Sequence, residues 1–245
     1  MHDERKPSLV ARFAVAIGVV SLLALAAAGP LHHVRLLGLR AAFLMLAGAL
    51  GGVVVTLVLA VIAIVVAARR RSGMSTAVTA LALALIAIGS LGAVVWKAAG
   101  VPPIHDVTTD TEHPPQFVAV LPLRAGALNP VEYGGPAIAA KQHTAFADIA
   151  PLTLNVPPDR AFDRALAAAR TMGWEMVASD PPAGRIEATD TTFWFGFKDD
   201  VVIRVTPEAG GSRVDVRSLS RVGGGDIGAN AARIRKYLAA LDAER

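Results

Sequence analysis

The class of this protein is decided by residues 41–68, AAFLMLAGALGGVVVTLVLAVIAIVVAA, which contain no Asp, Glu, Lys, Arg or His. A helix needs about 20 apolar residues to cross roughly 30 Å of hydrocarbon, and this run is longer than that. Residues 13–29 and 77–96 are uncharged as well. With a hydrophobic content of 53%, the three runs predict an α-helical membrane anchor of three transmembrane helices within residues 1–98.

The distribution of charge points to the lipid bilayer, and not to a nucleic acid, as the partner of the basic residues. Residues 1–96 hold eight Lys and Arg against two Asp and Glu, whereas residues 97–245 hold 16 against 18. The excess of positive charge therefore lies beside the apolar runs. Lipid headgroups and membrane insertion explain it without a polyanionic partner.

The basic residues also predict the orientation of the chain in the membrane. Six of them lie on one side of the membrane (Arg5, Lys6, Arg12 and Arg69–Arg71), and three lie on the other side (Arg35, Arg40 and Lys97). The positive-inside rule then places the N-terminus in the cytoplasm and residues 97–245 outside. The first run, with Ala26–Ala28 after it, also resembles a cleavable signal peptide. We expect it to be retained, and its removal would leave the C-terminal part on the same side.

The apolar runs predict anchoring and not transport. Their polar residues are Ser21, Thr56, Thr79 and Ser90, and none of these carries a charge across the hydrocarbon. Small residues recur four positions apart at Ala14 and Gly18, at Gly48 and Gly52, and at Gly89 and Ala93. Such spacing lets helix backbones approach closely, so we expect a compact hairpin or three-helix bundle.

Residues 99–150 form a strap that is interrupted by proline and glycine and shows no sustained period. Its length suggests that part of it docks on the domain that follows. The weak candidates for metal ligands in it are His105, Asp106, Asp110 and His113, but their spacing fits no helix face. We predict no metal and no cofactor. The chain has no cysteine, which excludes disulfides and thiolate metal sites.

Residues 151–245 show the periods of a small α+β domain, which we expect to be extracytoplasmic. Helix stripes are formed by Phe162, Leu166 and Ala169, and by Ile234, Leu238 and Leu241. Strands are predicted at residues 152–156, 174–180, from 185, 201–205 and 213–217. The predicted order is β-α-β-β-β-β-α, an antiparallel sheet covered by two helices. Arg185, Glu187, Arg213, Asp215 and Arg217 are expected on a solvent-exposed face.

The segment between the predicted strand that begins at residue 185 and the predicted strand at residues 201–205 is aromatic. Phe193, Phe195 and Phe197 share one parity, which is opposite to that of Ile186 and Ala188, so a bulge or break within residues 189–192 is needed to bring both sets into the core. Trp194 then points to the other side, as a candidate exposed anchor. A turn is predicted at Lys198–Asp200.

Residues 223–228, GGGDIG, satisfy the letters of the dinucleotide fingerprint G-x-G-x-x-G. The fingerprint requires a parallel βαβ unit with a later acidic residue, whereas the chain ends soon after Gly228 and the preceding strands are predicted to be antiparallel. We therefore predict no nucleotide. The glycines are better explained as a tight corner, with Asp226 or Asn230 capping the last helix and Arg221 pairing with Asp226.

The quoted features together resemble a bacterial family, the domain of unknown function numbered fourteen ninety-nine. The resemblance spans residues 101–242 and rests on the strap segments 102–110 and 114–115 and on residues 191–205, 217–223, Asp226, Gly228, Asn230, Arg233 and Ile234. Gly224 and Gly225 make the corner richer in glycine than the family pattern. The resemblance implies a membrane-associated envelope protein and assigns no activity or cofactor.

Two functions remain open from the sequence. In the first, the domain is a non-catalytic module that binds or scaffolds a lipid, glycan or protein of the envelope. Its candidate binding residues are Trp194, Arg217, Ser220, Arg221, Asp226, Asn230 and Arg233. In the second, it is an envelope hydrolase, metal-dependent or using His143 folded back onto Ser218 or Ser220. The sequence carries no Gly-x-Ser-x-Gly motif, which favours the first function.

Overall fold

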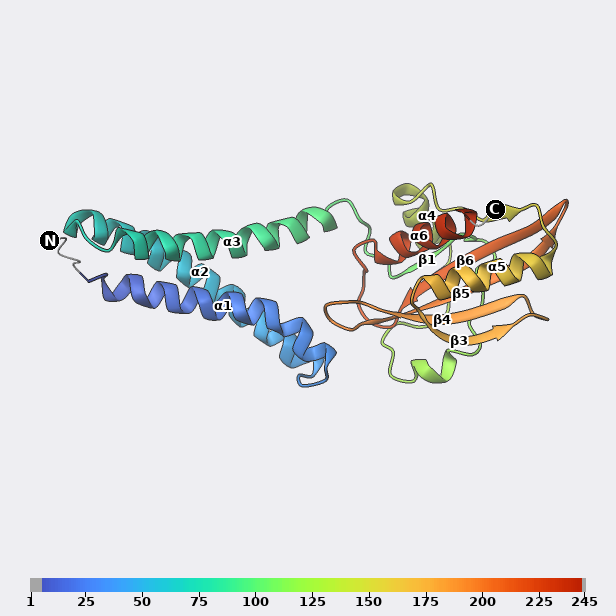
Figure 1. The fold of residues 1–245 in the computed structure, drawn as a ribbon, viewed down its shortest axis with the longest axis horizontal. Coiled ribbons are helices and arrows are strands. Elements are labelled where there is room, and N and C mark those ends of the chain that lie inside the picture. The colour runs from blue at the N-terminus through green and yellow to red at the C-terminus, as the bar shows by residue number, and fades with distance from the viewer. Residues whose placement is uncertain (1–5, 244–245) are drawn as a thin grey trace. The chain divides into compact units, whose positions relative to one another are not determined.

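The computed structural model describes residues 6–243. The chain forms two compact units, each with more contacts within itself than with the other (Figure 1). Unit 1 comprises the N-terminal helices through Lys97, together with Phe193–Gly196. Unit 2 comprises residues 98–192 and the chain from Phe197 onward. Arg5, which was counted among the cytoplasmic basic residues, lies outside the described residues.

Unit 1 contains three helices, each long and apolar enough to cross a membrane: α1 (Leu9–His33), α2 (Leu39–Arg70) and α3 (Met74–Ala98). Helix α1 begins where the Ser8 hydroxyl accepts a hydrogen bond from the amide of Ala11. Helix α2 ends at Arg71, which is in the left-handed conformation. These helices confirm the anchor predicted from the uncharged runs. Each helix is longer than its uncharged run and includes the charged residues or histidines beside it.

Small residues bring the helices of unit 1 together. Ala14 and Gly18 of α1 are buried, and the nearest neighbours of Gly18 are Thr56 of α2 and Leu83 of α3. Ala60 of α2 and Ala80 of α3 pack in the same cluster as Ala14. The spacing of small residues in the first run therefore marks a helix contact. A side chain at Gly48 or Gly89 would instead enter open space, so these glycines are not packing positions in the described chain.

Unit 2 is built on an antiparallel sheet. Its strands are β1 (Asp106–Thr108), β2 (Leu152–Leu154), β3 (Glu175–Asp180), β4 (Arg185–Thr191), β5 (Lys198–Glu208) and β6 (Gly211–Ser220). The sheet order is β1-β6-β5-β4-β3, and β2 also pairs with β6. The helices are η1 (Leu121–Arg124), α4 (Pro136–Ala145), α5 (Pro158–Thr171) and α6 (Ala229–Ala243). From β2 to α6 the elements follow the predicted order β-α-β-β-β-β-α.

One face of the sheet packs on the helices. Helices α5 and α6 lie over this face (Figure 1). Alternate residues of β4, β5 and β6, such as Ile186, Ile203 and Val216, share a core with Phe162 of α5 and Ile234 of α6. Proline at the start of α5 presets its first turn, and its apolar stripe faces the sheet as predicted. This face contains most of the hydrophobic core.

The opposite face of the sheet is also covered, which corrects the prediction of a solvent-exposed face. Phe117 and Val120 of the strap pack against Val202 and Leu219 from the far side of β5 and β6. The charged residues Glu187, Asp215 and Arg217 have no solvent exposure, although Arg185 and Arg213 keep partial exposure. The parity of these residues was predicted correctly, but the strap covers the surface that they share.

The turn predicted at Lys198–Asp200 is wrong, because these residues begin β5. The chain reverses earlier, in the aromatic segment, where the amide of Thr192 donates to the carbonyl of Phe197 at 2.8 Å. Two adjacent aspartates in a strand are tolerated because arginines pair with both of them. Phe193 is consequently 94% exposed and is not a core residue.

The glycine contacts of unit 1 make a prediction about its stability. Gly18→Leu is expected to lower the free energy of unfolding by about 1–3 kcal/mol, because a Cβ at this position meets Thr56 at 2.9 Å and Leu83 at 3.3 Å. Gly48→Leu is the matched control and should be nearly neutral. Titration of the full-length protein from mild detergent into dodecyl sulfate, followed by helical circular dichroism, measures both. Equal effects at the two positions would contradict the packing assigned to Gly18.

Candidate functional site

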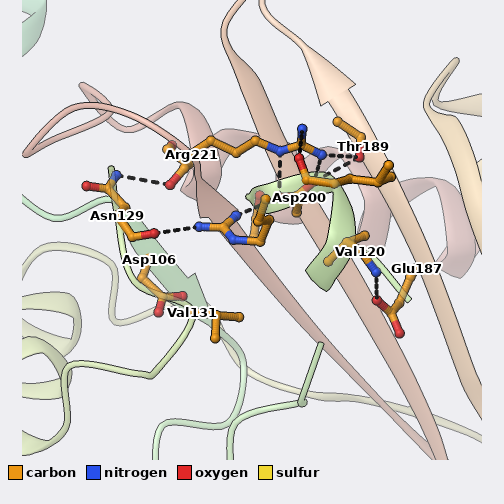
Figure 2. A network of polar contacts seen from close by, with 12 residues as sticks. Asp106, Val120, Asn129, Val131, Glu187, Thr189, Asp200 and Arg221 are labelled. Atoms are coloured by element: carbon orange, nitrogen blue, oxygen red, sulfur yellow. Dashed lines mark hydrogen bonds and ion pairs between the residues drawn. The ribbon is translucent and has the colours of Figure 1, made fainter. Parts of the chain in front are cut away.

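Glu187 of β4 attaches the strap to the sheet. Its carboxylate is fully buried and accepts hydrogen bonds from the backbone amides of Val118, Ala119 and Val120 at 2.9–3.1 Å (Figure 2). Arg185 lies 3.1 Å from the same carboxylate. Three convergent N–H groups at the entry to η1 provide a site for a negative charge. The contact therefore fixes where the strap crosses β4.

Asp200 of β5 is the centre of a second group of contacts on this face. Arg221 donates to it from Nε at 2.9 Å and from Nη2 at 2.7 Å, and Arg124 of η1 donates at 2.5 Å (Figure 2). The Thr189 hydroxyl donates at 2.8 Å to Oδ1, the oxygen that also accepts from Nη2 of Arg221. Arg124 also donates to the carbonyl of Asn129. One buried carboxylate thus joins β4, β5, the strap and the residue after β6.

Arg217 of β6 and Asp106 of β1 form a buried bidentate pair at 3.0 and 2.8 Å. The guanidinium also donates to the strap carbonyls of Pro115 and Val131. It lies over the ring of Tyr133, 5.6 Å from the centroid. Burial and the nearby Asp106 carboxylate raise the pKa of Tyr133 to about 12, so its hydroxyl stays protonated.

A fourth charged group lies farther along β5 and β6. Asp215 and Asp110 both accept from Arg204 and from Arg213 at distances between 2.9 and 3.2 Å. Asp110 also accepts from the backbone amide of His113 at 2.8 Å. Burial alone would raise the pKa of Asp110. The hydrogen bond from the His113 amide and the two arginines outweigh burial, so the pKa is lowered. The group fastens the first turn of the strap to the sheet.

The helix-covered face carries a polar cluster at the start of α6. Arg233 donates to Asp190 at 2.7 Å and to Asp199 at 2.6 Å, and it also contacts Asn230. Asn230 in turn accepts from the Ser218 hydroxyl and donates to that of Ser220. All of these side chains find partners in the cluster, so it binds α6 to the ends of β4, β5 and β6.

Asp226 caps α6, as predicted from the sequence. Its carboxylate accepts from the amides of Gly228 at 2.8 Å and Asn230 at 2.7 Å. Burial raises the pKa of Asp226 despite these two hydrogen bonds. The predicted pairing of Arg221 with Asp226 is wrong, because Arg221 turns to Asp200 on the other face of the sheet.

The structure therefore does not bring the predicted site residues into one place. Ser220, Asn230 and Arg233 belong to the α6 cluster, Arg217 and Arg221 to separate ion pairs under the strap, and Asp226 to the helix cap. Trp194 belongs to unit 1, is 42% exposed, and donates to the carbonyl of Ala26 at 3.3 Å. A ligand-binding role for these residues stays a prediction.

The four candidate metal ligands also have separate contacts. Asp106 binds Arg217, Asp110 binds two other arginines, and the carbonyl of His105 accepts from the amide of Ser220. Within residues 6–243, no three His, Asp or Glu side chains lie close enough together to hold a metal ion. His143 contacts the Thr111 hydroxyl at 3.0 Å, whereas Ser218 and Ser220 contact Asn230.

A groove of about 420 Å³ lies at the opposite end of the sheet from the α6 cluster. It is lined by residues of α5, by Pro181–Gly184 of the β3–β4 turn, and by Val205–Pro207 of β5. Phe162 lines it, and the carboxylates of Asp159 and Asp163 stand beside it, one turn of α5 apart. Its volume lies in the range of small-ligand sites.

The groove has rigid walls. Gly184 has a φ of +60°, and a Cβ there would lie 2.2 Å from the carbonyl oxygen of Val205. Its amide donates to Pro181, and its carbonyl accepts from Val205. Prolines 158, 181, 182 and 207 restrict the remaining backbone. The predicted strands at 174–180 and from 185 require a turn at Pro181–Gly184, but the sequence does not show that this turn meets α5, because that contact is not local.

The sequence analysis also missed Arg124, Glu187 and Asp200 as organising residues. One feature of the sequence could have indicated these contacts. Arg124 is the one charged residue between residues 114 and 131 of the strap, and the predicted strands carry charged residues at alternate positions. An isolated arginine in an apolar segment suggests an inward-facing partner, since unpaired burial of a charge is costly. The identity of that partner depends on strand register.

The contacts of Glu187 predict the effect of a conservative substitution. Glu187→Gln is expected to lower the free energy of unfolding by about 2–4 kcal/mol, because an amide replaces one acceptor oxygen with a donor that faces backbone N–H groups. The control Glu175→Gln removes an exposed ion pair with Lys198 and should cost less than about 1 kcal/mol. Urea unfolding of the full-length protein in detergent compares them. Comparable losses would show that Glu187 does not hold the strap.

Comparison with known proteins agrees with the family suggested by the sequence. The family model described as protein of unknown function (DUF1499) matches residues 106–241, more than half of the chain. The match covers the strap from residue 106, the sheet from β1 to β6 and nearly all of α6. No curated protein matches the chain. With its membrane-anchor-like helices followed by this domain, the chain belongs to the family DUF1499.

Proposed function

We propose that this protein is a non-catalytic binding or scaffolding module of the bacterial cell envelope. In this proposal α1–α3 anchor it in the inner membrane and residues 99–245 form its extracytoplasmic domain. The observation that carries the proposal is the groove beside α5, a preformed apolar hollow at the end of the sheet remote from the anchor's attachment. The domain would hold a partner there at a set distance from the bilayer.

The charges of the sheet support binding over catalysis. Glu187, Asp190, Asp199, Asp200 and Asp215 are each paired with at least one arginine. A general acid or base needs a pKa near the working pH and access to substrate. Carboxylates held by guanidinium groups under a strap or helix lack that access to substrate. The ion pairs are therefore better explained as structural.

The groove favours a ligand that is partly apolar and positively charged. Phe162 and four prolines line it, and Asp159 and Asp163 form no ion pair among the described residues. A carboxylate pair one helical turn apart attracts ammonium or guanidinium groups. We therefore propose that the envelope component is a protein segment that carries Lys or Arg among apolar residues.

The test is binding to the full-length protein in lipid nanodiscs. A short peptide of alternating Lys and Pro is expected to raise the unfolding temperature, and Asp159→Asn/Asp163→Asn to weaken its affinity about tenfold or more. Glu132→Gln, which removes an exposed carboxylate outside the groove, is the control. The double variant removes two negative charges beside the groove, whereas the control removes one negative charge away from it.

Other ligands give outcomes that contradict the proposal. Stabilisation by a glycan fragment or a free lipid, insensitive to Asp159 and Asp163, would move the binding site elsewhere. Stabilisation by Zn²⁺ that is lost on replacing His105 and His113 would favour the metal-dependent hydrolase. A peptide effect of equal size in the double variant would remove the groove from the proposal.

The proposed orientation has its own test. The basic residues before α1 and between α2 and α3 outnumber those at the other helix ends, which supports a cytoplasmic N-terminus. Alkaline phosphatase fused after Arg245 is therefore expected to be active in cells, and a green fluorescent protein at the same position to be dark. A fusion after Arg71 is the matched control and should show the reverse. The opposite pattern at Arg245 would place the domain in the cytoplasm.

A further inference from the structure

The chain enters unit 2 a short distance after the last apolar helix. Helix α3 ends at Ala98, and Ile104 is already buried in the core of unit 2. The intervening residues can span at most about 20 Å when fully extended. Trp96 and Lys97, at the end of α3, are typical of the boundary between hydrocarbon and water. The point of attachment on unit 2 therefore stays close to the bilayer surface.

The attachment point defines one end of the sheet. The carbonyl of His105 accepts from Ser220, the last residue of β6, and that of Ile104 accepts from Asp226. The carbonyl of Lys198, the first residue of β5, accepts from the amide of Arg221. The other end of β5, at Glu208, lies about 35 Å away along the strand. The end that carries residues 220–228 is thus the one tethered to the membrane.

Exposed aliphatic side chains gather at this end. Leu123 is 51% exposed, Leu128 75% and Ile227 43%. The carbonyl of Leu123 and the amide of Leu128 both contact Arg221, which places this part of the strap beside the end of β6. Arg124, the one charged residue between 114 and 131, turns inward to Asp200. We call Leu123, Leu128 and Ile227 the apolar rim.

Ile227 has a conformation that its side chain opposes. Its φ is +54°, in the left-handed region, where a β-branched residue is rare and costs about 1 kcal/mol or more. Glycine would adopt this conformation freely, as Gly223 and Gly228 do nearby. The exposed isoleucine contributes little to the core that would offset the strain. Its retention is explained if the side chain contacts something outside unit 2.

The connection between β4 and β5 leaves the sheet at the same end, between Thr191 and Lys198. It contains Phe193, whose side chain is 94% exposed, and Trp194. It carries no charged residue from Thr192 to Phe197. Tryptophan and phenylalanine partition to the interface between lipid headgroups and acyl chains. The connection that joins the sheet to these aromatic residues of unit 1 therefore leaves from the end of the sheet that is tethered to the membrane.

We propose that the apolar rim lies in the interfacial region of the phospholipid bilayer that α1–α3 cross. A tether of about 20 Å keeps the rim at high effective concentration near the surface, so even a small apolar area is enough to hold it there. The proposal depends on membrane insertion of the helices and is independent of the groove, which lies at the other end of the sheet. Contact with the bilayer at the rim would leave the groove facing away from the membrane.

Site-specific labelling of the full-length protein in nanodiscs tests the proposal. The chain has no cysteine, so Leu128→Cys and Ile227→Cys can each carry a single environment-sensitive fluorophore. Ala183→Cys, in the β3–β4 turn at the distal end, is the control. With one protein per nanodisc of phosphatidylcholine and phosphatidylglycerol, the rim labels are expected to be quenched by doxyl-labelled lipids and shielded from iodide. The control label should show the reverse.

Three results would overturn the proposal. The first is equal iodide quenching at positions 128 and 183, which would place the rim in water. The second is shielding that arises only when two proteins share a nanodisc, which would make a second copy the partner. The third would come from Ile227→Gly. This variant is expected to unfold at the same or a higher urea concentration and to reduce lipid quenching at a label on position 128. Lower stability with unchanged quenching would show that Ile227 serves the fold alone.

Discussion

Ion pairs between the sheet and the strap are the constraint on which unit 2 depends. Glu187, Asp200 and Arg217 lie on the face of the sheet away from the helices, and each binds backbone or side chains of residues 106–131. A segment rich in proline and glycine cannot form a helix or strand of useful length to cover that face. Charge-assisted hydrogen bonds hold it instead, at defined points along the sheet.

These contacts determine position more than net stability. A buried ion pair contributes little beyond a well-packed apolar pair, but breaking one partner of it leaves an uncompensated charge. A one-residue shift of β6 would direct Arg217 to the helix-covered face and Val216 to the strap. The alternation of aliphatic residues on one face and paired charges on the other therefore makes any other strand register costly.

The two ends of the sheet have different surroundings. The end that carries Ser220 and Asp226 receives the chain from the anchor and bears the apolar rim, whereas the end with Gly184 and Pro207 bears the groove. The sheet between them is rigid because both of its faces are covered. In the proposed arrangement, the sheet is a rigid spacer between the apolar rim and the groove.

The sequence alone determined the anchor, the order of elements in residues 151–245 and the family. These follow from local properties, namely uncharged runs of membrane length, periods of two and of about 3.6 residues, and short motifs. Tertiary structure decided which charges are buried, why Lys198–Asp200 form a strand, and where the strap lies. Asp106 and Arg217 are 111 residues apart in the chain, and Arg124 and Asp200 are 76 apart. Such pairs form only after the strands have adopted their register, because the free energy that buries a charge comes from a partner that local sequence does not specify.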